Sequence, residues 1–231
     1  MIYLLKKICL PGLLLIFWLA GCGEKKSAVA PNNPPPDSLP VRTPPDTANN
    51  IVFFGNSITA GYGLEPENWF TTLLQERIDS LRLPYRVVNA GISGETSAGG
   101  LSRIDWVLSR PVTIFILELG GNDGLRGISL QQTTANLQAI IDRVSQRAPS
   151  AKLILAGMEI PPNLGARYTT EFHDLYPALA KKNRTHFIPF LLEGVGGVDS
   201  LNQHDGIHPN EKGEKIVAEN IWKVLRKLLG V

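Results

Sequence analysis

This sequence has few cysteines and histidines, and its net charge is small. Its 231 residues contain two Cys and four His, and 23 Lys and Arg face 21 Asp and Glu. Two cysteines cannot build a disulfide-rich scaffold or a zinc site of four cysteines. A formal net charge of +2 lacks the basic excess that is typical of nucleic-acid-binding domains. The composition therefore argues against a nucleic-acid partner and against cysteine-bound metal.

Motifs for phosphate, dinucleotides and zinc are missing as well. No Gly-x-x-x-x-Gly-Lys-Ser/Thr loop is present, and residues 64–66 after Gly61 and Gly63 do not match Gly-x-Gly-x-x-Gly. The Gly-x-Ser-x-Gly elbow of α/β-hydrolases is absent too. The four histidines form no clear zinc motif, and Asp205-x-x-His208 alone is a weak metal signal. We therefore expect neither a cofactor nor a metal.

The longest apolar run lies at the amino terminus, and it is short. Lys6 and Lys7 precede an apolar stretch over residues 8–19, and small residues then lead to Cys22. A transmembrane helix needs about 20 apolar residues. A basic start, a short apolar core and small residues are instead typical of a secretory signal peptide. The alternative is that Cys22 is a buried cysteine at the end of an uncleaved helix.

The residues around Cys22 indicate where the mature chain resides. Residues 19–22, Leu-Ala-Gly-Cys, resemble a bacterial lipobox, which implies cleavage before Cys22 and acylation of that cysteine. A signal peptide over 1–21 would carry Cys9 away, so the mature chain would have no free thiol. The sequence thus predicts a membrane partner through lipidated Cys22 and a place in the bacterial cell envelope, facing the periplasm.

Residues 22–49 differ in composition from residues 50–231. Asn, Ser, Ala and Lys surround proline groups at 34–36 and 44–45, with few large apolar side chains. Such a segment cannot bury enough apolar surface to offset the entropy of ordering it, and its prolines favour an extended spacer. We predict a tether over 22–49 and one globular domain of ordinary size over 50–231.

Strand-like and helix-like apolar patterns alternate from residue 51 onward. Short apolar runs indicate buried strands, and longer segments carry apolar residues at helical spacing. This alternation predicts an α/β fold with three layers, α/β/α, around a five-stranded parallel sheet. The expected strands are 51–54, 86–89, 112–119, 152–156 and 186–190, and the expected helices are 69–83, 97–109, 130–147, 171–182 and 211–229.

Polar residues follow these strands, at the edge where parallel sheets bind ligands. Ser57 follows the first strand, residues 89–96 the second and 120–124 the third, and Asp205 and His208 follow the fifth. Serine, histidine and aspartate at one edge are the inventory of a Ser–His–Asp hydrolase. Each has a simpler explanation, with Ser57 or Asp205 as a helix cap and His208 as a loop residue. Their joint placement favours the hydrolase.

Four sequence blocks in this order resemble the SGNH superfamily of GDSL-type esterases and lipases, most closely its bacterial thioesterase, lysophospholipase and arylesterase branch. The resemblance covers about residues 50–230 and implies a flavodoxin-like SGNH hydrolase fold. The blocks are Gly-Asn-Ser-Ile around Ser57, Gly-Ile-Ser-Gly ending at Gly94, Gly-Gly-Asn-Asp around Asn122, and Asp-Gly-Ile-His-Pro with Asp205 and His208.

The resemblance implies a role for each of these residues. Ser57 would be the nucleophile, His208 the general base, and Asp205 the group that orients His208. The oxyanion hole would combine the backbone N–H groups of Ser57 and Gly94 with the side-chain amide of Asn122.

Two neighbouring residues qualify this assignment. Asn56 stands where the family's nucleophile block usually has Asp. Because that aspartate is not a triad member in the family, activity is expected to survive, but a charge beside Ser57 is lost. Ser93, directly before Gly94, is a rival nucleophile.

The same resemblance implies hydrolysis of short to medium acyl esters, thioesters or lysophospholipids through an acyl-enzyme. Residues 158–163 and 124–130 are expected to line the acyl site. A carbohydrate O-acetylesterase is the enzymatic alternative, because the superfamily contains such enzymes. A non-catalytic, lipid-tethered binding protein on the same fold is the other alternative. The complete Ser–His–Asp set argues against it.

Overall fold

The computed structural model describes residues 49–231. Strands and helices alternate along this part of the chain. The strands are β1 (Asn49–Gly55), β2 (Tyr85–Gly91), β3 (Ile114–Glu118), β4 (Lys152–Ala156) and β5 (His186–Ile188). The α-helices are α1 (Ser57–Ala60), α2 (Phe70–Ser80), α3 (Ser97–Val107), α4 (Gly121–Leu125), α5 (Leu130–Arg147), α6 (Ala166–Asn183) and α7 (Glu211–Leu229).

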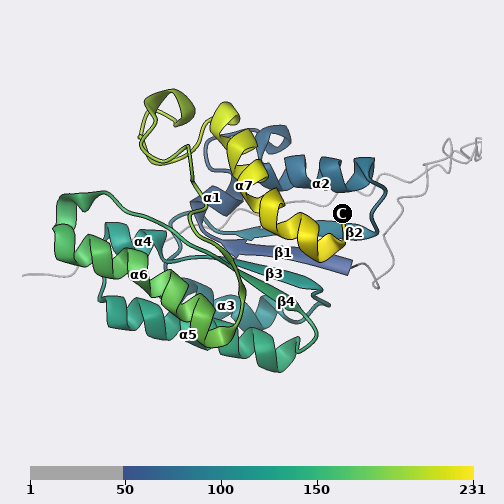
Figure 1. Ribbon diagram of the computed structural model, residues 1–231, viewed down its shortest axis with the longest axis horizontal. Helices are drawn as coiled ribbons and strands as arrows, with labels where there is room; N and C mark the ends of the chain where they lie inside the picture. Colours follow the sequence, from purple (N-terminus) through teal and green to yellow (C-terminus); the bar gives the residue numbers. More distant parts are fainter. Residues whose placement is uncertain (1–48) are drawn as a thin grey trace, which may run out of the picture. The chain divides into compact units, whose positions relative to one another are not determined.

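The five strands form one parallel sheet in the order β2-β1-β3-β4-β5. Helices α2 and α7 cover one face of the sheet, and α3, α5 and α6 cover the other (Figure 1). The predicted three-layer α/β/α fold with a five-stranded parallel sheet is therefore confirmed. The strand order reverses beside β1, since β2 lies on one side of it and β3 on the other. Open parallel sheets bind ligands at such a reversal, beyond the carboxyl ends of the strands.

The inner strands are apolar on both faces because helices cover both. Phe54 in β1, Phe115 in β3 and Ile154 in β4 are fully buried, whereas the edge strand β2 is only partly buried. Helices α5 and α7 turn one apolar face to the sheet, with Leu137 and Ile221 fully buried. Each such side chain contributes about 1.5–3 kcal/mol when removed from water. The core thus holds the strand ends at fixed positions.

Helix ends differ from the sequence prediction where no side chain marks them. The helix expected at 171–182 begins at Ala166, after Gly165, which has no side chain to cap it. The helix expected at 69–83 ends at Ser80, and Arg82 then takes a left-handed φ of 55°. The short helices α1 and α4 have four and five residues, too few for an apolar period to appear.

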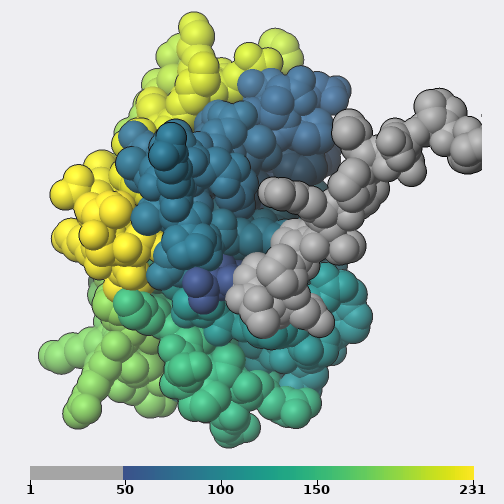
Figure 2. Space-filling view, turned by 90° about the vertical axis from the view of Figure 1, so that its right-hand side faces the viewer, coloured from purple at the N-terminus to yellow at the C-terminus, as the bar shows by residue number. Residues whose placement is uncertain are grey.

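Two predicted segments, the signal peptide over 1–21 and nearly all of the tether over 22–49, lie outside the described residues. Asn49, the last residue assigned to the tether, instead begins β1 by pairing with Tyr85. Figure 2 faces the end of the sheet where β1 begins, in purple, opposite to the carboxyl ends of the strands. Between residues 49 and 231, no helix combines the length and apolar character needed to cross a bilayer.

Candidate active site

A cavity of about 630 Å³ opens at the carboxyl edge of the sheet. The segments that follow the strands form its walls, and most of the lining is apolar. Ser57, Gly94, Asn122 and His208 all line this one cavity. The fold therefore brings the four sequence blocks to a single site.

Ser57, His208 and Asp205 form a continuous hydrogen-bonded chain. Ser57 is the first residue of α1, so it lies directly beyond the end of β1. The distance from Ser57 Oγ to His208 Nε2 is 2.8 Å, and His208 Nδ1 lies 2.6 Å from Asp205 Oδ2. These distances suit a base that takes the serine proton and a carboxylate that orients the base.

Asp205 is kept ionised by its own loop. Its Oδ1 accepts the backbone N–H of Ile207 at 2.9 Å and that of His208 at 3.0 Å. Partial burial acts to raise the pKa of Asp205, but these bonds and the bond to the His208 ring lower it from 3.8 to about 2. Helix α7 is capped by Asn210, whose Oδ1 accepts the N–H of Gly213 at 3.2 Å. Capping therefore does not explain Asp205.

Two residues outside the expected site support His208. The ring of Tyr62 packs against the His208 ring, with 4.7 Å between the centroids. The backbone N–H of Gln203 donates to the carbonyl of His208 at 2.7 Å, and its side-chain amide donates to the carbonyl of Tyr62 at 2.7 Å. No local pattern signals these contacts, since Tyr62 and Gln203 are 141 positions apart.

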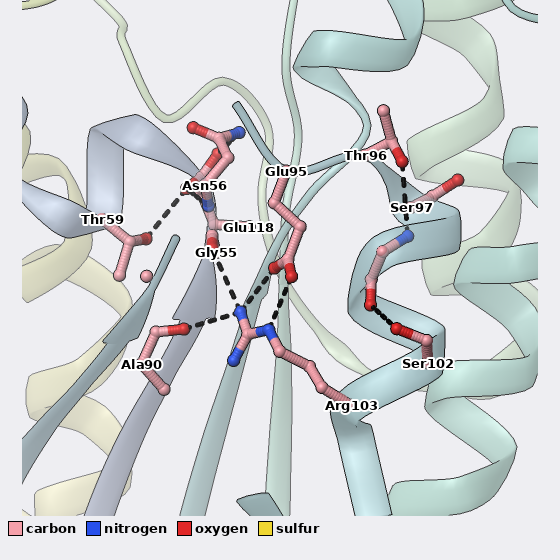
Figure 3. A network of polar contacts seen from close by, with 12 residues as sticks. Gly55, Asn56, Thr59, Ala90, Glu95, Thr96, Ser97, Ser102, Arg103 and Glu118 are labelled. Carbon is pink, nitrogen blue, oxygen red and sulfur yellow. Dashed lines mark hydrogen bonds and ion pairs between the residues drawn. The ribbon is translucent and has the colours of Figure 1, made fainter. Parts of the chain in front are cut away.

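The turn that carries Ser57 is bound to the buried side chain of Glu118. Asn56, rather than Ser57, caps α1, because its Oδ1 accepts the N–H of Ile58 at 2.9 Å. Asn56 donates to Glu118 from its side-chain amide at 2.6 Å and from its backbone N–H at 3.0 Å. The hydroxyl of Thr59 donates to Glu118 at 2.8 Å. Three hydrogen bonds thus tie the turn to the end of β3, and Figure 3 shows the one from Thr59 as a dashed line.

Glu118 is almost fully enclosed, with 1% of its surface exposed. Burial raises its pKa from 4.5 to about 7, although the donors from Asn56 and Thr59 act to lower it. Gly55 leaves the space that Glu118 fills, since a Cβ there would lie 2.3 Å from Glu118 Oε2. None of the four sequence blocks includes Glu118. A lone acidic residue near the end of the apolar run 112–119 is a signal that could have found it.

The three residues expected to supply oxyanion donors all line the cavity. The N–H of Ser57 lies in the first turn of α1, where it has no intrahelical acceptor. Gly94 has a φ of 77°, which favours glycine. Asn122 Nδ2 donates one N–H to the carbonyl of Glu95 at 3.0 Å, and the amide carries a second N–H. Three segments thus bring candidate donors to the same cavity, as an oxyanion hole requires.

A second buried carboxylate, Asp123, fixes the start of α3. It accepts the backbone N–H of Ser97 at 2.8 Å, the hydroxyl of Ser97 at 2.5 Å and the hydroxyl of Thr133 at 3.3 Å. Asp123 is 1% exposed. The loop that carries Gly94 is consequently anchored where it enters α3. The sequence blocks predict a role for the adjacent Asn122 but none for Asp123.

The expected walls of the acyl site are partly right. Residues 158–162 line the cavity, but Asn163 does not, and of the described residues 124–130 only Leu125 does. Ser93 also lines the cavity, but His208 Nε2 bonds to Ser57 Oγ, which favours Ser57 as the nucleophile. Across residues 49–231, no three His, Cys, Asp or Glu side chains gather closely enough to hold a metal ion.

A parallel α/β sheet with serine, histidine and aspartate hydrogen-bonded at its carboxyl edge defines a serine hydrolase. Within that class, the chain belongs to the GDSL-like Lipase/Acylhydrolase family, whose model matches residues 53–216. The predicted membership in the SGNH/GDSL esterases is thereby confirmed.

Named relatives agree with this family. The chain is 42% identical over 194 residues to Esterase TesA of Pseudomonas aeruginosa, covering 83% of this chain and 95% of that protein. It is 37% identical over 183 residues to Thioesterase 1/protease 1/lysophospholipase L1 of Escherichia coli K12, covering 79% of this chain and 86% of that protein. A crystal structure of TesA matches with a TM-score of 0.74 at 41% identity, covering 78% of this chain and 99% of that one.

Asn56→Asp tests the departure from the usual Gly-Asp-Ser block. The new carboxyl could keep the cap on α1 but would place an acidic oxygen against Glu118, where the amide now lies 2.6 Å away. The two carboxyls would share a proton, which raises the folded-state pKa of one of them above its value in the unfolded chain. Stability is then lost as the pH rises from the unfolded towards the folded pKa. Between about pH 5 and about pH 8 we expect the melting temperature to fall by ~2–4 °C more than in the wild type, equivalent to about 1 kcal/mol.

The matched control is Asn163→Asp, which adds the same carboxyl at an exposed position. Its melting temperature should follow the wild-type pH dependence. Identical curves for both variants would show that the residue at position 56 does not sense Glu118.

Proposed function

We propose that this chain is a serine esterase that cleaves carboxylic esters or thioesters of short to medium acyl chains through an acyl-enzyme. The observation that carries the proposal is the 2.8 Å contact between Ser57 Oγ and His208 Nε2, with Asp205 on the other ring nitrogen. Membership of a family of ester hydrolases supports it independently.

Turnover would proceed in two half-reactions. His208 takes the proton of Ser57 Oγ as that oxygen bonds to the carbonyl carbon, and gives it to the leaving alcohol or thiol as the ester bond breaks. A water molecule then attacks the acyl-enzyme with His208 as base, which releases the acid and restores Ser57. Asp205 stays ionised at neutral pH because its pKa is about 2, so it can hold the His208 tautomer throughout.

Exposed apolar side chains around the cavity support an amphiphilic substrate. Nine large apolar residues are exposed in the described chain, and six of them line the cavity or lie within two positions of a lining residue. An acyl chain that enters an apolar cavity gains about 0.8 kcal/mol for each buried CH₂ group. The six residues are Tyr62, Ile92, Leu125, Leu164, Val198 and Ile207.

The cavity lining disfavours one alternative, and the catalytic residues disfavour the other. A carbohydrate O-acetylesterase needs many polar groups to hold a sugar, whereas Met158, Ile160, Pro161 and Pro162 make the wall largely apolar. A non-catalytic binding protein would not need the complete hydrogen-bonded chain from Ser57 to Asp205.

We further propose that the mature chain is lipid-anchored through Cys22 in the bacterial cell envelope, facing the periplasm. The lipobox-like residues 19–22 and the proline-rich composition of 22–48 support this placement. An enzyme tethered at a membrane meets amphiphilic esters at high local concentration.

Ser57→Ala removes the proposed nucleophile. Hydrolysis of p-nitrophenyl butyrate should fall to background, and labelling by a fluorophosphonate should disappear, with an unchanged circular dichroism spectrum. Ser93→Ala is the control, and it should keep both activities. Labelling that persists in Ser57→Ala but vanishes in Ser93→Ala would reverse the assignment.

Asn122→Ala removes one proposed oxyanion donor. Because that donor acts on charge that develops in the transition state, kcat should fall by about 10²–10³-fold while KM changes little. Steady-state kinetics with the same ester measures both. A rise in KM with unchanged kcat would assign Asn122 to substrate binding instead.

Cys22→Ser tests the anchor. In bacteria grown with a labelled fatty acid, the wild type should incorporate label and sediment with membranes, whereas Cys22→Ser should do neither. Cys9→Ser is the matched control, because Cys9 lies inside the predicted signal peptide, and it should behave as the wild type. Label that persists in Cys22→Ser would contradict the proposal.

A further inference from the structure

A largely buried ion pair joins the loop after β2 to helix α3. Arg103 Nε donates to Glu95 Oε1 at 2.6 Å, and a second guanidinium nitrogen donates to Glu95 Oε2. The two side chains are 16% and 7% exposed. The guanidinium also lies over the ring of Phe54, 4.1 Å from its centroid. Arginine suits such a position because its planar fork binds both carboxylate oxygens at once.

Glu95 is linked to two of the three proposed oxyanion donors, to one by a peptide bond and to the other by a hydrogen bond. It directly follows Gly94, and its carbonyl oxygen accepts the side-chain N–H of Asn122 at 3.0 Å. Its side chain occupies space left by Gly99, where a Cβ would lie 3.0 Å from Glu95 Cγ. The ion pair therefore holds the residue that directly follows Gly94 and that accepts a hydrogen bond from Asn122.

Arg103 also reaches the strand that leads to Ser57. Its guanidinium donates to the carbonyl of Ala90 at 2.8 Å and to the carbonyl of Gly55 at 3.4 Å (Figure 3). The Gly55 carbonyl accepts the N–H of Ile92 at 3.0 Å as well. The loop after β2 is thus joined to the end of β1, two residues before Ser57.

We infer that the Arg103–Glu95 pair positions the oxyanion hole. It holds three donors at fixed positions relative to one another, namely the N–H groups of Ser57 and Gly94 and the amide of Asn122. The inference rests on the proposed function, because it assigns the pair to the same site. Neither residue touches the reacting atoms. Both act through the three donors, whose placement to within a fraction of an ångström decides how well they stabilise a transition state.

Arg103→Met removes the charge and the fork but keeps an apolar stem over Phe54. With p-nitrophenyl butyrate, kcat should fall by about 10–100-fold while KM changes by less than about threefold. Arg103→Lys keeps the charge without the fork, and its kcat should lie between those of Arg103→Met and the wild type.

Arg77→Met is the matched control, because Arg77 also combines an ion pair with a cation–π contact. Arg77 lies 2.7 Å from Glu219 and 4.9 Å from the centroid of the Trp222 ring, in α2 and α7 on the other face of the sheet. This variant should leave kcat within about twofold of the wild type. Should Arg103→Met fail to fold, Glu95→Gln is the second variant, since it keeps the side-chain shape and loses only the charge.

A double-mutant cycle with Asn122→Ala separates positioning from a general structural effect. If Arg103 acts through the donors, Arg103→Met should reduce kcat by a clearly smaller factor in the Asn122→Ala background than in the wild type, because one of the three donors that it positions is gone. The pH dependence of kcat/KM should keep its midpoint, because the contacts of Arg103 do not include His208.

An equal loss of kcat in both backgrounds, or a shifted midpoint, would overturn the inference. Unchanged kcat in Arg103→Met would do the same. A failure of the proposed function looks different, because Ser57→Ala would then keep its hydrolysis of the ester and its fluorophosphonate labelling.

Discussion

Parallel strands all end at one edge of a sheet, and polar groups must be held there against an apolar core. The buried carboxylate of Glu118 meets this constraint. It ends β3 and accepts three hydrogen bonds from the turn after β1, so the position of Ser57 follows from the register between two neighbouring strands. His208 and Asp205 lie on a loop some 150 residues later in the chain. This loop places His208 beside Ser57, whose position the sheet already fixes.

The same solution recurs at the neighbouring strand ends. Asp123 binds the start of α3, and Glu95 pairs with Arg103 between the ends of β1 and β2. A buried charge is costly unless its hydrogen bonds are made, so each carboxylate stabilises one arrangement of its loop and penalises others. Loops held in this way suit an esterase, because oxyanion stabilisation depends on donors that are in place before the reaction begins. Above these fixed groups, the apolar wall of the cavity is suited to an acyl chain.

Much of the fold could be predicted because its signals are local. The apolar strands and the helical spacing of α5 and α7 appear within single windows of sequence. The start of α6 at Ala166 could not, since Gly165 provides no capping side chain. In the site, Ser57 and His208 stand in recognisable blocks. Glu118 does not, because its partner Asn56 lies 62 positions away.

The sequence by itself determined the order of strands and helices and the residue types at the strand ends, because both depend on neighbours along the chain. Only the tertiary structure decided how those residues are used. Asn56 became the cap of α1, and Ser57 Oγ became the hydrogen-bond partner of His208. Arg103 came to lie between the ends of two strands. Such roles depend on hydrogen bonds between distant segments, and a hydrogen bond forms only when folding brings donor and acceptor to about 3 Å.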